Sequence, residues 1–127
     1  MYRYRIAVVL SGVMLFAGCA AKNDGRFHLS GKVTVDGEPV PSGDLILEPD
    51  IGNKGPSSMA RIEDGTYSLP EEQGIVGGKY TVTIVAFDGV AVGELVDGKA
   101  LLREPYLEKV DFPKEDSTRD FDIKRRK

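Results

Sequence analysis

The residues that could do chemistry in this 127-residue chain are few, because it contains one cysteine and one histidine. The cysteine, Cys19, follows a basic run at Tyr2 to Arg5, an apolar run from Ile6 to Leu15, and the small pair Ala17-Gly18. A basic start, a short apolar centre and small residues before a cleavage point are typical of a secretory signal peptide. The thiol therefore lies where a signal peptidase would cut.

A membrane-spanning helix is the competing interpretation of this apolar run. Ile6 to Ala17 provides only about 12 residues, including Ser11 and Gly12, whereas a spanning helix needs roughly 20 apolar residues. The run is too short to span a bilayer comfortably, and a signal peptide is favoured.

The small residues directly before Cys19 resemble the bacterial lipobox, although Phe16 stands where that family usually has leucine. The resemblance implies that the thiol of Cys19 takes a diacylglycerol and becomes the mature N-terminus. Ala20 stands where an aspartate would favour inner-membrane retention, so the outer membrane is preferred. The alternative is an unmodified thiol in an ordinary signal peptide.

The composition predicts one folded domain behind this segment. Removing residues 1–18 leaves 109 residues and changes the formal net charge from −3 to −5, because Arg3 and Arg5 are lost. A domain of this size can build a core without disulfides, and an acidic balance makes nucleic acid an unexpected partner. The 15 glycines and 7 prolines favour short strands and turns over long helices.

Alternating apolar residues predict strands along the rest of the chain. The apolar positions recur at every second residue, and Asp36-Gly37 and Asp64-Gly65 are turn pairs. The segment from Asp88 to Arg103 is expected to be a loose hairpin or long loop, with at most a helical turn around Leu101 to Tyr106. The expected inward residues are Leu29, Gly31, Val33, Val35, Leu45, Leu47, Tyr67, Leu69, Tyr80, Val82, Ile84, Phe121 and Ile123.

Three of these segments together resemble carboxypeptidase regulatory-like domains, which are transthyretin-like (prealbumin-like) β-sandwiches. They are Gly31 to Val40, Asp64 to Leu69, and Gly78 to Ile84, and the resemblance covers about residues 29–86. It implies an all-β fold, a two-sheet antiparallel β-sandwich of about seven strands. The expected organisation is a lipoprotein signal peptide at 1–18, a lipidated tether at 19–26, the sandwich at 27–124 and a basic tail at 125–127.

Several other constellations were weighed as chemical sites. The single histidine, His28, could act as a general base, but no motif fixes a serine or cysteine beside it. Glu71-Glu72 could be a carboxylate pair, but adjacent acids on an extended segment point apart and cannot flank a glycosidic bond. Oxygen atoms of loop acids could bind calcium, and the candidates are Glu48, Asp50, Glu63 and Asp64. No stretch of the chain has the EF-hand spacing, so we interpret these acids as solvated.

An isopeptide bond between strands would require a lysine near the start of the domain and an acid near its end. Lys32 with Asp120 or Asp122 has this arrangement. The alternation of each strand places all three side chains on the outward face, which argues against the bond.

The expected function is therefore a non-enzymatic, membrane-anchored lipoprotein whose β-sandwich has a binding or structural role in the cell envelope. Cys19 attaches it to the membrane, no cofactor or metal is expected, and the partner would be an envelope protein or a glycan. Loops 50–57 and 88–103 are where a partner would bind, since loops on rigid sandwiches carry function. A small-ligand carrier of transthyretin type is the alternative, and an enzyme is the third hypothesis.

Overall fold

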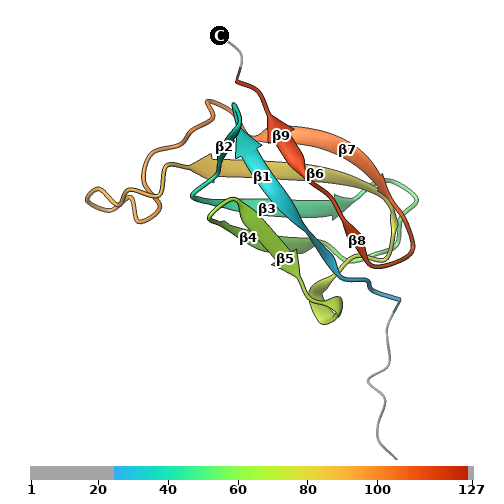
Figure 1. Ribbon diagram of the computed structural model, residues 1–127. Helices are drawn as coiled ribbons and strands as arrows, with labels where there is room; N and C mark the ends of the chain where they lie inside the picture. The colour runs from blue at the N-terminus through green and yellow to red at the C-terminus, as the bar shows by residue number, and fades with distance from the viewer. Residues whose placement is uncertain (1–24, 126–127) are drawn as a thin grey trace, which may run out of the picture.

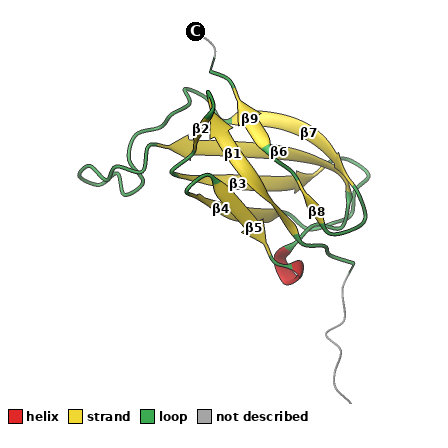
Figure 2. Ribbon diagram, viewed as in Figure 1, coloured by secondary structure: helices red, strands yellow, loops and turns green. Residues whose placement is uncertain are grey.

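The computed structural model describes residues 25–125, so Cys19 and the predicted signal peptide lie outside the described residues. Strands dominate the described part, with one 3-10 turn, η1 (Glu71–Gln73) (Figures 1 and 2). The strands are β1 (Leu29–Val35), β2 (Glu38–Pro39), β3 (Ser42–Pro49), β4 (Ser58–Glu63), β5 (Thr66–Leu69), β6 (Gly78–Phe87), β7 (Tyr106–Phe112), β8 (Ser117–Thr118) and β9 (Phe121–Ile123).

Backbone pairing links these strands into one strongly curled, mainly antiparallel sheet, in the order β2-β1-β5-β4-β3-β6-β7. The sheet folds over where β4 and β5 diverge, since they share a single paired position, Glu63 with Thr66. The all-β prediction is confirmed, but the strands form one connected sheet. β8 and β9 also differ from the antiparallel expectation, because both pair with β1 in the parallel direction.

The core lies inside this curl, and the predicted inward residues make up most of it. All of them except Gly31 are buried, including Tyr67 and Tyr80. Tyr67 packs near Phe121 with ring centroids 6.2 Å apart, and Tyr80 meets Phe112 edge-on at 5.7 Å. Gly31 is half-buried, and β1 approaches the backbone of Arg119 there so closely that an added Cβ would lie 1.8 Å from the Arg119 carbonyl oxygen.

The two predicted aspartate-glycine turns are confirmed. Asp36 and Gly37 have φ of 52° and 82°, and Asp64 and Gly65 have φ of 49° and 77°. Two consecutive positive φ angles are what a tight hairpin turn of the I′ type requires, and aspartate followed by glycine adopts them at little cost.

β7 is the principal element that the sequence pattern did not predict. No element was predicted between the helical turn considered around Leu101 to Tyr106 and Phe121, yet Tyr106–Phe112 pairs with β6 along its whole length, so β6 is a central strand as predicted. Only Val110 and Phe112 of β7 are fully buried, while Glu108 occupies an inward position and the outward Leu107 is 64% exposed. The apolar alternation is broken at both of these positions, which conceals the strand in the sequence.

Candidate functional site

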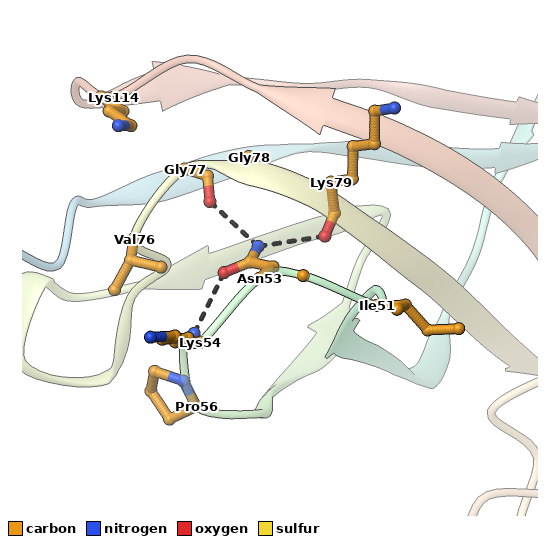
Figure 3. Close-up of a pocket in the computed structure, with 11 residues that line it drawn as sticks. Ile51, Asn53, Lys54, Pro56, Val76, Gly77, Gly78, Lys79 and Lys114 are labelled. Atoms are coloured by element: carbon orange, nitrogen blue, oxygen red, sulfur yellow. Dashed lines mark hydrogen bonds between the residues drawn. The ribbon is translucent and has the colours of Figure 1, made fainter.

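An open groove of about 750 Å³ lies at one end of the sheet. Three segments form it: the loop of residues 51–56 after β3, the turn of residues 76–79 that begins β6, and Lys114 after β7 (Figure 3). The first segment belongs to a loop that the sequence predicted as a binding loop. The other two segments are distant in sequence and only the fold brings them to it.

Asn53 holds the walls of the groove together. Its Nδ2 donates to the carbonyl oxygens of Gly77 (3.1 Å) and Lys79 (3.0 Å), and its Oδ1 accepts from the backbone N–H of Gly55 (3.0 Å) (Figure 3). The backbone N–H of Asn53 also donates to the Asp50 carbonyl oxygen, which closes a turn at the end of β3. Both polar atoms of the Asn53 side chain are therefore engaged in hydrogen bonds with the backbone of its own loop and of the turn that begins β6.

Small residues bring the two walls of the groove close together. A Cβ on Gly55 would lie 2.4 Å from Val76 Cγ2, and one on Gly77 would lie 2.8 Å from Lys114 Cγ. Gly77 also has a φ of 82°, which other residues rarely adopt. The hydroxyl of Tyr80 accepts from the Val76 backbone N–H at 3.1 Å, which fixes the turn from the core side.

The charged side chains in the groove lining are all lysines: Lys54, Lys79 and Lys114. Within residues 25–125, none of the three forms an ion pair within 4.0 Å. Asp50, at the edge of the groove, instead pairs with Lys109 at 3.6 Å. The backbone N–H of Ile51, followed by the charge of Lys109, lowers the pKa of the Asp50 carboxyl.

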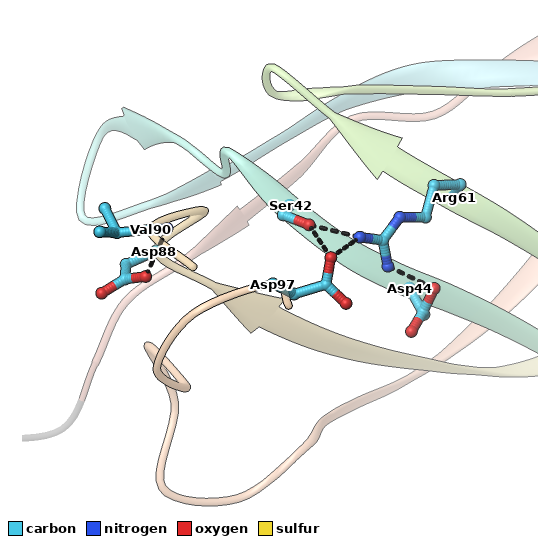
Figure 4. Close-up of polar contacts among 6 residues, drawn as sticks. All are labelled: Ser42, Asp44, Arg61, Asp88, Val90 and Asp97. Carbon is cyan, nitrogen blue, oxygen red and sulfur yellow. Dashed lines mark hydrogen bonds and ion pairs between the residues drawn. The ribbon is translucent and has the colours of Figure 1, made fainter. Parts of the chain in front are cut away.

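The second predicted binding loop, residues 88–103, is attached to the sheet by a polar cluster (Figure 4). Arg61 donates to Asp44 at 3.1 Å and also contacts Ser42 and Asp97. The Ser42 hydroxyl donates to Asp97 Oδ1 at 2.9 Å. This hydrogen bond, together with Arg61, lowers the pKa of Asp97 against the raising effect of burial.

Asp88 organises the same loop from its other end. Its Oδ1 accepts from the backbone N–H groups of Val90 (2.9 Å) and Lys99 (3.1 Å), so the chain turns and returns beside itself. Four large apolar side chains stand exposed on this loop: Val90, Val92, Leu95 and Val96.

His28 has a serine neighbour that no sequence motif indicates. Its Nε2 lies 3.2 Å from the Ser68 hydroxyl oxygen, because β1 pairs with β5. Asp116 accepts from the backbone N–H of His28 at 2.8 Å. The Asp116 carboxylate therefore binds the His28 backbone and does not orient the imidazole ring, as the partner of a general base would.

The outward orientation of the isopeptide candidates is confirmed. Lys32, Asp120 and Asp122 are exposed. Asp120 accepts from the Lys32 backbone N–H at 2.8 Å, and Asp122 accepts from the Thr34 hydroxyl at 2.9 Å. The two aspartates therefore fasten the parallel β9 region to β1 by ordinary hydrogen bonds.

The acids considered as calcium ligands do not form a metal-binding cluster in the described part of the chain. Among the described residues, no group of three or more histidine, cysteine, aspartate or glutamate side chains could hold a metal ion. Glu71 and Glu72 are exposed on η1. Over the same residues, no helix has the length and apolar character to cross a bilayer.

Comparison with known proteins gives no family assignment: no family model matches the chain, and no curated protein matches it significantly. The groove is thus characterised by its own residues. The sequence signal that could have pointed to its second wall is the glycine cluster Gly74, Gly77 and Gly78 directly before Lys79.

Proposed function

We propose that this protein is a non-enzymatic lipoprotein, anchored by a lipid on Cys19, whose β domain binds a ligand or partner in the cell envelope. The proposed organisation is a signal peptide at 1–18, a tether at 19–26, the domain at 27–124 and a basic tail at 125–127. The domain is proposed to be of the transthyretin-like, carboxypeptidase regulatory-like class. The curl of the sheet around one core and the motifs of residues 29–86 support this class.

The observation that carries the proposal is the place where the chain enters the domain. Arg26 Nε donates to the carbonyl oxygen of Gly74 at 3.0 Å, and Phe27 exchanges backbone hydrogen bonds with Ile75. The groove wall begins at the next residue, Val76. In Figure 1 the chain accordingly leaves the domain at the end of the sheet where β6 begins.

The tether is short, which limits how far this end of the domain stands from a membrane. Six residues, 20–25, extend from Cys19 to the start of the described chain, and they span at most about 20 Å. A lipid on Cys19 therefore keeps the groove near the bilayer, so a ligand would be met at or close to the membrane surface.

A binding role is supported over catalysis by the polar groups available. The His28 and Ser68 pair is exposed and lacks an orienting carboxylate on the imidazole, and the Asp97 and Arg61 cluster is an ion pair that holds a loop. A groove on a rigid sheet, walled by loops, is the usual place for a binding site on a β domain.

The decisive experiment is the substitution Cys19→Ser in the full chain. We expect the native protein to fractionate with membranes, to begin at Cys19 and to carry a diacylglycerol mass. Cys19→Ser should lose both the lipid mass and the cleavage before residue 19, whereas the control Ala20→Ser should retain both. If Cys19→Ser leaves the mature mass and the membrane fraction unchanged, the lipoprotein proposal fails. Separation of inner and outer membranes tests the outer-membrane assignment.

A dimeric small-ligand carrier is the second candidate, and β7 favours it. β7 pairs with β6 alone among the described strands, so its other edge can accept a strand of a second copy. Sedimentation or scattering should then give a dimer mass for the detergent-solubilised protein. A strict monomer would remove this candidate.

A further inference from the structure

The groove has a chemistry that selects among ligand classes. Its lining includes four glycines and the apolar side chains of Ile51, Pro56 and Val76, none of which can recognise a polar ligand through a side chain. The Asn53 amide is committed to Gly77, Lys79 and Gly55. The side-chain groups left to meet a ligand are three lysine ammonium groups, which are donors only.

A groove whose charged side chains are all cationic favours an anion over a neutral sugar. A glycan presents many hydroxyl groups, which need acceptors as well as donors, and apart from the committed Asn53 amide no side chain of the lining supplies an acceptor. Lysine binds phosphate as a point charge, and a phosphate monoester carries close to two negative charges where a single carboxylate carries one, so three lysines match the phosphate better.

The lysines come from three different segments of the groove wall: Lys54 from the Asn53 loop, Lys79 from the start of β6, and Lys114 from the chain after β7. Their ammonium groups point apart in Figure 3, so binding one ligand requires these side chains to rotate towards it. All three are exposed, and their flexible stems allow the ammonium groups to reorient.

Two acids lie near Lys79. Asp111 is opposite it in the register of β6 with β7, and Asp50, which pairs with Lys109, has its pKa lowered by the charge of Lys79 as well. Neither forms an ion pair with Lys79 within 4.0 Å.

We infer that this groove binds a phosphate ester, with Lys54, Lys79 and Lys114 supplying the positive charge. The inference rests on the proposed binding function and names its ligand class. Two sources of this chemistry lie within reach of a domain tethered at Cys19: the phosphate of an anionic lipid headgroup and a soluble phosphorylated compound.

The first test measures binding of glycerol phosphate by equilibrium dialysis, using the full-length protein in a detergent that lacks phosphorus. A groove variant, Lys54→Gln/Lys79→Gln/Lys114→Gln, is compared with a control variant, Lys32→Gln/Lys99→Gln/Lys124→Gln, which removes the same charge from exposed positions outside the groove. Each lysine near an anion contributes about fivefold, so the groove variant should bind on the order of 100-fold more weakly.

The second test determines the source of the phosphate. The lipidated protein is placed in vesicles of phosphatidylglycerol or of an uncharged glycolipid, and the acylation rate of each lysine is measured by mass spectrometry. Headgroup binding should protect the three groove lysines in phosphatidylglycerol alone, while Lys32, Lys99 and Lys124 react equally in both. Protection by glycerol phosphate but not by phosphatidylglycerol would assign the site to a soluble ligand.

The inference is overturned if neither glycerol phosphate nor phosphatidylglycerol is bound. It is equally overturned if the groove and control variants bind alike, or if acetate at the same ionic strength competes as well as phosphate. The dialysis needs no acyl chain, so its outcome is independent of whether Cys19 is lipidated, and the two proposals fail separately.

Discussion

The side-chain nitrogen of Asn53 donates to the carbonyl oxygen of Gly77 over 3.1 Å, so one polar side chain joins the two walls of the groove. Removing it should release the loop. We expect Asn53→Ala to lower the free energy of unfolding by about 1 to 2 kcal/mol, because the loop and strand carbonyl oxygens lose their donor. Urea unfolding and hydrogen exchange of residues 51–56 measure the effect. Lys54→Ala, at an exposed neighbour, should change neither, and equal losses in the two variants would contradict the assigned role of Asn53.

The ion pair between Asp97 and Arg61 should make the attachment of the second loop dependent on pH. The pKa of Asp97 is lowered in the folded protein, so its stabilising effect is complete above the ordinary aspartate pKa of about 3.9 and is lost as pH falls through the lowered value. The stability difference between the native protein and Asp97→Asn should therefore be constant near neutral pH and shrink below about pH 4. Thermal unfolding across this range tests it, and a difference that grows on acidification would refute it.

Tyr67 should remain neutral to unusually high pH. Burial, with the nearby charge of Asp120, raises the pKa of its phenol, and the hydroxyl donates to the Arg119 carbonyl oxygen at 2.6 Å. Its contribution is therefore complete below the ordinary tyrosine pKa of about 10 and is lost as pH rises towards the raised value. Tyr67→Phe should cost about 1 kcal/mol at neutral pH and remove a tyrosine that ionises above the ordinary pKa in an ultraviolet titration. Loss of a tyrosine that ionises near pH 10 would contradict this assignment.

Gly31 should tolerate no side chain. A Cβ there would lie 1.8 Å from the Arg119 carbonyl oxygen and 2.6 Å from its carbon, where β1 meets the segment between β8 and β9. We expect Gly31→Ala to destabilise the fold by about 3 kcal/mol, because a backbone must move to admit the methyl group. Ser30→Ala, the adjacent position on β1, is the control. Similar denaturation midpoints for the two variants would show that the approach is looser than the structure indicates.

The alternation of apolar and polar residues was sufficient to predict a strand wherever every inward position of that strand is apolar. Tyr80, Val82 and Ile84 alternate with polar residues on β6, and all three are fully buried. The aspartate-glycine turns were equally predictable, because positive φ at consecutive positions restricts the residue types. β7 was not predictable in this way, because Glu108 on its inner side is accommodated by an ion pair at 3.1 Å with Arg119, which the fold brings in from the segment between β8 and β9.

Local sequence pattern predicts the all-β class, the alternating part of the core, the loop that forms one wall of the groove, and the position of Cys19 after an apolar segment. These follow from periodicity and residue type, which act over a few neighbours. The parallel pairing of β9 with β1, the approach of Ser68 to His28, and the common groove of Lys54, Lys79 and Lys114 come from the folded arrangement instead. Each of these depends on strand register and loop closure across more than 20 residues, and such long-range pairing is set by packing of the whole core rather than by local preference.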